Sequence, residues 1–208
     1  LQQQGRTTWS SLTIYDKPSF SAKVLNLYGR DVILPITETL HIEGEHAYNH
    51  VWYRIGDEGF AHSAYLQPVF TSYNLPVLDI PTEGVLAEMT VPFMPIRLGA
   101  GYFFRPKKRY YYGTTYWVDQ IIQIPDDGTY WYRIFDNLTK DHFFVPSYCL
   151  RIVPDEELAP ISPNVVPEEK HIYVDIETQT MVAYEGDVPV ATSLVASGWG
   201  GTPTPVGT

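Results

Sequence analysis

The sequence predicts an all-β chain, and three features carry that prediction. Its 16 Tyr and 5 Trp fall with β-branched residues in short runs that 17 Pro and 15 Gly separate, as in short strands joined by turns. The run Trp52-Tyr53-Arg54-Ile55 returns as Trp131-Tyr132-Arg133-Ile134, which indicates a repeated unit. No stretch has the apolar spacing of an amphipathic helix of three turns. We therefore expect small β units in tandem.

The first unit is predicted over residues 1–69. Strands are expected at residues 11–15, 32–36 and 51–55, and the segment 60–66 closes the unit. Asp16-Lys17-Pro18 and Gly56-Asp57-Glu58-Gly59 have the composition of turns between these strands.

A second unit is predicted over residues 85–153 because the motifs of the first recur there. Thr13-Ile14 and Pro18 are matched with Thr90-Val91 and Pro95, and Phe60-Ala61 with Phe144-Val145. The second copy is expected to carry a longer hairpin loop through residues 137–141, which surface hairpins tolerate.

Two linkers follow from proline and charge. The first is expected at residues 70–84. The second, residues 154–169, contains Pro154, Pro160, Pro163 and Pro167 among five carboxylates. Proline restricts φ and like charges repel, so we expect the second linker to be extended and stiff.

The last segment, residues 170–208, predicts a meander of three strands at 171–176, 181–184 and 188–196. Ile172, Val174 and Ile176 alternate along the first strand, and Glu185-Gly186-Asp187 forms a turn before the third. A Gly-rich run, Gly198-Trp199-Gly200-Gly201, and a Pro-punctuated run follow. Three strands in so few residues cannot bury a core of their own. We expect something to cover them, or the third strand, 188–196, to mediate self-association.

Two resemblances follow from these motifs. The C-terminal runs I-x-V-D-I-x-T-Q, A-Y-E-G-D, P-V-x-T-S-L-V-A-S-G and T-P-T-P-x-G-T resemble the start of an L,D-transpeptidase catalytic domain, whose members cross-link peptidoglycan through a cysteine thioester. The two repeated units resemble bacterial SH3-like domains, which are small barrels that position cell-wall enzymes. The resemblance implies a nucleophile in a Ser-His-Gly-Cys run preceded by another catalytic His. Neither occurs in residues 1–208, so we expect them beyond Thr208 and assign no catalytic, cofactor or metal residue.

Composition excludes several classes of function. A net charge of −10 argues against nucleic acid, whose phosphates would be repelled. The basic cluster Arg105-Pro106-Lys107-Lys108-Arg109 precedes three tyrosines, Tyr110 to Tyr112, and is interpreted as a solvated hairpin loop entering a strand rather than a polyanion site. No apolar run is long enough for a transmembrane helix. The start at Leu1 has neither Met nor a signal pattern, so either a leader has been removed or the first residues are not recorded.

Several side chains could carry chemistry, but their sequence context favours structural roles. Cys149, the only thiol, lies in Ser147-Tyr148-Cys149-Leu150 without an evident base except His142, so we interpret it as structural. His41, Glu43, Glu45, His46 and His50 crowd one loop, but their spacing fits no metal motif and predicts a polar loop. The run from Gly198 to Gly201 lacks the following helix of a phosphate-binding turn.

Trp52, Tyr53, Trp131 and Tyr132 lie on predicted strands, so one of each pair is expected to face out. Exposed aromatics would suit a peptide or sugar. The resemblances imply an extracytoplasmic protein of the cell wall whose partner is peptidoglycan or its stem peptides. A non-catalytic envelope protein that binds or assembles through the same modules is the alternative.

Overall fold

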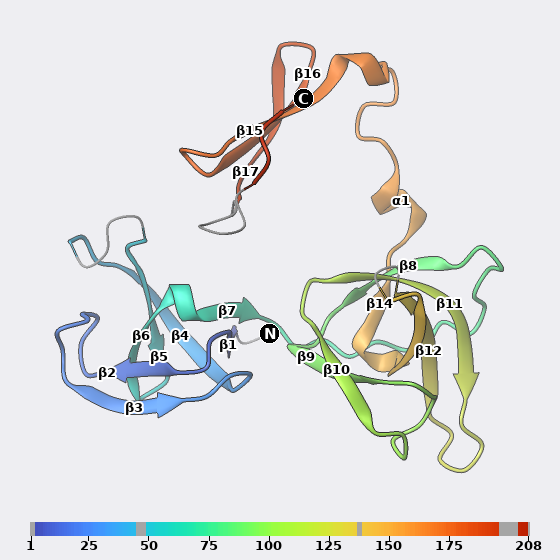
Figure 1. Cartoon of the computed structure of the whole chain (residues 1–208), viewed down its shortest axis with the longest axis horizontal. Coiled ribbons are helices and arrows are strands. Elements are labelled where there is room, and N and C mark those ends of the chain that lie inside the picture. Colours follow the sequence, from blue (N-terminus) through green and yellow to red (C-terminus); the bar gives the residue numbers. More distant parts are fainter. Residues whose placement is uncertain (1–2, 45–48, 137–138, 196–203, 208) are drawn as a thin grey trace. The chain divides into compact units, whose positions relative to one another are not determined.

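A computed structural model describes residues 3–44, 49–136, 139–195 and 204–207, and these form an all-β chain of antiparallel sheets. The helical segments are short: α1 spans Asp155–Leu158, and single 3₁₀ turns lie at η1 (Ser63–Tyr65), η2 (Ser147–Cys149) and η3 (Pro167–Glu169). The chain divides into two compact units, 1–154 and 155–208, which are described separately (Figure 1). None of the helices in the described ranges has the length and apolar character needed to cross a bilayer.

The compact unit of residues 1–154 contains two seven-stranded sheets with the same topology (Figure 1). The first repeat has the order β3-β2-β6-β5-β4-β1-β7, and the second has β10-β9-β13-β12-β11-β8-β14, so each strand has a counterpart seven strands later. The repeat inferred from Trp52-Tyr53 and Trp131-Tyr132 is therefore confirmed at the level of topology. The strands of the first repeat are β1 (Gln4–Thr7), β2 (Leu12–Tyr15), β3 (Val24–Tyr28), β4 (Ile33–His41), β5 (Val51–Ile55), β6 (Gly59–His62) and β7 (Leu66–Val69); those of the second are β8 (Val85–Met89), β9 (Phe93–Arg97), β10 (Pro106–Tyr111), β11 (Thr115–Gln123), β12 (Tyr130–Asp136), β13 (Asp141–Pro146) and β14 (Leu150–Ile152).

The register corrects the predicted alignment of the two repeats. Tyr15 pairs with Phe60 in the first repeat, and Arg97 pairs with Phe144 in the second. The offset over the opening strands is therefore 82 residues (97 − 15 = 82), and matching Thr13-Ile14 with Thr90-Val91 was wrong. Thr90 and Val91 follow β8, the counterpart of β1, and precede β9. The Thr-apolar pair at Thr90-Val91 precedes β9, whereas Thr13-Ile14 lies within β2. Only the pairing of the strands shows that β9, and not Thr90-Val91, corresponds to β2.

Each repeat buries its own apolar core. Leu12, Ile14, Tyr53 and Ile55 belong to the first core, and the equivalent strands supply a second core around Ile96, Tyr132, Ile134 and Val145. Alternation on β5 sends Trp52 to the opposite face from Tyr53.

The expectation that one aromatic of each pair faces solvent is wrong. Trp52, Tyr53, Trp131 and Tyr132 are all buried. The tyrosines enter the cores, and the tryptophans are covered from the other side, Trp52 by Phe20 and Trp131 by Tyr102. Both covering rings come from loops, which periodicity along a strand does not reveal.

The compact unit of residues 155–208 has the expected three-strand meander, with strands β15 (Lys170–Asp175), β16 (Thr180–Glu185) and β17 (Val188–Leu194). The apolar side chains of β15 and β17 are exposed, including Ile172, Val174 and Val190, and those of β16 are half-buried. The predicted third strand ends at Leu194, and Ala196 lies outside the described residues. The segment 154–169 is not simply extended, because α1 and η3 lie within it. Asp155, Glu156 and Glu157 occupy the first turn of α1, where their negative charges interact favourably with the positive end of the helix dipole.

Candidate functional site

An aromatic pocket of about 250 Å³ lies on the first repeat. Four aromatic side chains, one imidazole and two hydroxyl groups line it: Trp9, Tyr15, Phe20, Tyr65, His62, Ser11 and Thr13. Trp9 is 63% exposed, so its indole is available at the rim. Ring faces beside hydroxyl groups offer both apolar contact and hydrogen bonding to a ligand.

Three separate segments bring these rings together. Trp9 precedes β2, and Tyr15 ends it. The connection from β2 to β3 carries Phe20, and it is closed by hydrogen bonds from the amide of Asp16 to the carbonyl of Lys23 (3.0 Å) and from the amide of Lys23 to Asp16 Oδ1 (3.1 Å). The η1 turn carries Tyr65. The pocket thus depends on tertiary pairing rather than on one local motif.

His62 lines the pocket, and the buried Trp52 packs against three of the lining rings. His62 is buried, and both of its ring nitrogens are engaged, Nε2 with the carbonyl of Asn49 at 3.0 Å and Nδ1 as acceptor from the amide of Ala64 at 3.3 Å. The Trp52 ring lies 4.9 Å from Phe20, 5.8 Å from Tyr15 and 5.1 Å from His62, measured between centroids. A packed aromatic layer therefore holds the exposed rim in place.

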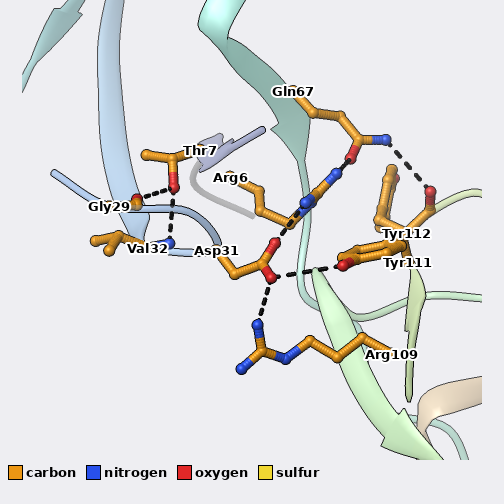
Figure 2. Close-up of polar contacts among 9 residues, drawn as sticks. All are labelled: Arg6, Thr7, Gly29, Asp31, Val32, Gln67, Arg109, Tyr111 and Tyr112. Carbon is orange, nitrogen blue, oxygen red and sulfur yellow. Dashed lines mark hydrogen bonds and ion pairs between the residues drawn. The ribbon is translucent and has the colours of Figure 1, made fainter. Parts of the chain in front are cut away.

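Apart from the pocket, a cluster of polar side chains joins the two repeats (Figure 2). Asp31 accepts hydrogen bonds from Arg6 Nη1 at 2.6 Å and from Arg109 Nη1. The Arg6 guanidinium lies 4.2 Å from the centroid of the Tyr111 ring, and Gln67 Oε1 accepts from Arg6 Nε and Nη2 at 3.1 and 2.8 Å. Since Arg109 and Tyr111 lie on β10, this cluster fixes one repeat against the other.

The backbone at Asp31 shows how specialised this position is. Asp31 has φ of 63°, and its amide donates to the carbonyl of Thr7. In the second repeat Gly113 has φ of 72° and donates to Met89 in the same way. Glycine is the residue that adopts such a φ without strain. An aspartate at this position strains the backbone, but it places a carboxylate between the two repeats.

Burial opposes the ionisation of Asp31, but hydrogen bonds and charge from Arg6 and Arg109 outweigh it and hold the pKa of the carboxyl below its ordinary value. Asp31 is therefore ionised at neutral pH, and its single negative charge is shared by the two guanidinium groups.

Cys149 is fully buried, which confirms the structural interpretation. Its Sγ donates to the carbonyl of Pro146 at 2.9 Å, and burial raises the pKa of the thiol to about 12. The thiolate needed for nucleophilic attack does not form near neutral pH.

The basic cluster is placed differently from the prediction. Only Arg105 precedes β10, and Lys107, Lys108 and Arg109 lie within the strand, so the interpretation as a loop is wrong. Their side chains are exposed, yet Lys108 pairs with Asp136 and Arg109 with Asp31. Two of the cations thus serve contacts inside the chain.

The other predicted groups form no site that the structure describes. Glu45, His46 and residues 198–201 lie outside the described residues. Within the described ranges, no group of three or more His, Cys, Asp or Glu side chains is arranged to hold a metal. His41 ends β4, and His50 precedes β5.

Sequence reasoning missed Trp9, Phe20 and Tyr65 as pocket residues. An aromatic in a short polar connection, such as Phe20 between Ser19 and Ser21, was a usable signal, because exposed aromatics in loops often contact ligands.

No protein-family model matches this chain, and no curated protein is detectably similar to it.

Proposed function

We propose that this chain is the wall-binding part of an extracytoplasmic, peptidoglycan-modifying protein, in which the two repeats act as SH3-like barrels. The observation that carries the proposal is the aromatic pocket of the first repeat, with its exposed Trp9 rim and the hydroxyl groups of Ser11 and Thr13. Rings and hydroxyls in a shallow pocket suit a peptide or a sugar of the wall.

The proposed catalytic context is an L,D-transpeptidase, in which a cysteine attacks a stem-peptide carbonyl and passes the acyl group to an amine. Support comes from the C-terminal motifs and from the meander β15 to β17, whose strands fall where those motifs predict them. The exposed apolar side chains of this meander are those expected of a sheet that packs against further structure.

The alternative is a non-catalytic envelope protein that binds or assembles through the same modules. Cys149 is buried with a raised pKa, so the thiol within residues 1–208 is not a nucleophile. The coding sequence after the Thr208 codon separates the two: a Ser-His-Gly-Cys run supports the enzyme, and a stop codon supports the binding protein.

Co-sedimentation of the chain with purified peptidoglycan sacculi tests wall binding. Truncating an aromatic hot spot costs about 2 kcal/mol or more, so Trp9→Ala should weaken binding roughly thirtyfold. Phe103→Ala, which removes an exposed ring from the second repeat, should pellet like the unaltered chain. Failure of the unaltered chain to pellet where a known wall binder does would reject the proposal.

A further inference from the structure

The second repeat holds a cation where the first repeat has its pocket. Arg97 is only 9% exposed, and its Cζ lies 5.3 Å from the centroid of the Tyr102 ring and 5.7 Å from that of Trp131. Its Nε and Nη1 donate to the carbonyls of Phe104 and Pro95 at 3.0 and 2.8 Å. None of the ion pairs within the described ranges involves Arg97. Ring faces and carbonyl oxygens therefore stabilise a buried guanidinium without a carboxylate.

The aromatic partners of Arg97 have direct counterparts in the first repeat. Tyr102 lies five residues after Arg97, as Phe20 lies five after Tyr15. The ring centroids of Phe20 and Trp52 are 4.9 Å apart, and those of Tyr102 and Trp131 are also 4.9 Å apart. The two repeats thus build the same aromatic pair, but the residue at the end of the second strand is Arg97 in one and Tyr15 in the other.

The first repeat adds rings at positions where the second has none. Val91 and Cys149 stand in the second repeat where the first has Trp9 and Tyr65, because the amides of Thr8 and Thr90 donate to the carbonyls of Tyr65 and Cys149 in the same way. All the described residues that line the first pocket are uncharged or imidazole-bearing. Several aromatic rings with no cationic side chain among the described lining residues are an arrangement suited to organic cations.

We infer that the pocket of Trp9, Tyr15, Phe20 and Tyr65 binds an alkylammonium or guanidinium group of the ligand. The net charge of −10 favours the approach of such cations over long range. This inference deepens the proposed function, on which its biological source rests: the free amines of wall stem peptides are the expected cations. Choline carried by another wall polymer has the same chemistry.

A titration of the whole chain with small cations tests the site independently of the wall. Choline and methylguanidinium should shift the backbone amide NMR signals of the pocket residues Phe20 and Tyr65, and 3,3-dimethylbutan-1-ol, the uncharged isostere of choline, should bind about tenfold more weakly. Trp9→Ala should abolish the response. Tyr15→Arg should also block it, by supplying the cation that Arg97 supplies in the second repeat. Phe103→Ala is the matched control and should leave the titration unchanged.

The outcomes separate this inference from the proposed function. Equal affinity for choline and its uncharged isostere, or binding that survives both Trp9→Ala and Tyr15→Arg, would overturn the cation site even if sacculi still bind. Cation binding without sacculus binding would keep the site and reject the wall as its source. Acetylating the free amines of sacculi should reduce pelleting if stem peptides supply the cation; unchanged pelleting, with competition by choline, would identify a choline-bearing polymer instead.

Discussion

Replacing Asp31 with Asn removes a buried negative charge and keeps the size of the side chain. The Asp31 side chain is 3% exposed and that of Arg6 is 8% exposed, so the variant leaves the Arg6 charge buried without its counter-ion. Breaking such a pair costs about 3–5 kcal/mol. Gln67 and the Tyr111 ring still contact Arg6, so we expect the lower end, about 3 kcal/mol.

The contribution of Arg109 should be much smaller. Its side chain is 48% exposed, and solvent screens such a pair to about 1 kcal/mol or less. Arg109→Gln should therefore destabilise far less than Asp31→Asn, because it removes one exposed partner of the carboxylate and leaves the buried Arg6–Asp31 pair intact.

Urea unfolding followed by tryptophan fluorescence measures both variants. With a slope of about 2 kcal/mol/M, Asp31→Asn should lower the midpoint by roughly 1.5 M. Asp57→Asn, which changes an exposed turn carboxylate, is the control and should stay within about 0.5 kcal/mol. A midpoint for Asp31→Asn equal to that of the control would refute the claim that this carboxylate holds buried charge.

The same contact predicts a pH dependence. Because the folded pKa of Asp31 is lowered, its contribution is complete above the ordinary carboxyl pKa near 4 and is lost as the pH falls through the lower folded value. The stability difference between the unaltered chain and Asp31→Asn should therefore be constant from about pH 5 to 7 and shrink in stronger acid. A difference that grows in acid would contradict this sign.

Three further predictions concern other parts of the chain. Cys149 should resist a thiol reagent at pH 8 until the protein unfolds, since burial raises its pKa to about 12; rapid labelling of the folded chain would show the burial to be wrong. In a chain ending at Thr208, amides from residue 172 to 195 should exchange rapidly, or the chain should oligomerise through these strands, because their apolar side chains are exposed. Protection equal to that around Trp52 and Trp131 in a monomer would refute this. Gly59→Ala should destabilise the first repeat by more than about 2 kcal/mol, because a Cβ there would lie 2.3 Å from the Tyr15 carbonyl oxygen at φ of 136°; a Tm shift of under about 4 °C would contradict it.

The all-β class, the repeat and the meander could be predicted from the sequence because they depend on local patterns of residues. Aromatic alternation marks β5 and β12, and turn residues mark the meander. The sequence did not reveal β1, whose residues Gln4–Thr7 include no apolar side chain, or β3, whose residues Val24–Tyr28 are mostly exposed. These strands exist because of pairing with distant partners rather than burial of their own side chains.

The pocket and the inter-repeat cluster were beyond sequence reasoning for the same reason. Asp31 and Arg109 are 78 residues apart, and nothing local to either names the other. Phe20 lines the pocket because the β2–β3 connection places it against Trp52, a contact that the local sequence does not indicate.

Wall binding by this pocket can be tested by mapping the amide shifts of the chain on addition of soluble peptidoglycan fragments. We expect the largest changes at Trp9, Tyr15, Phe20 and Tyr65, and we expect Trp9→Ala to remove those at the other three residues. Changes confined to the exposed basic residues of β10, or no changes at fragment concentrations that saturate a known wall binder, would contradict the assignment of wall binding to this pocket.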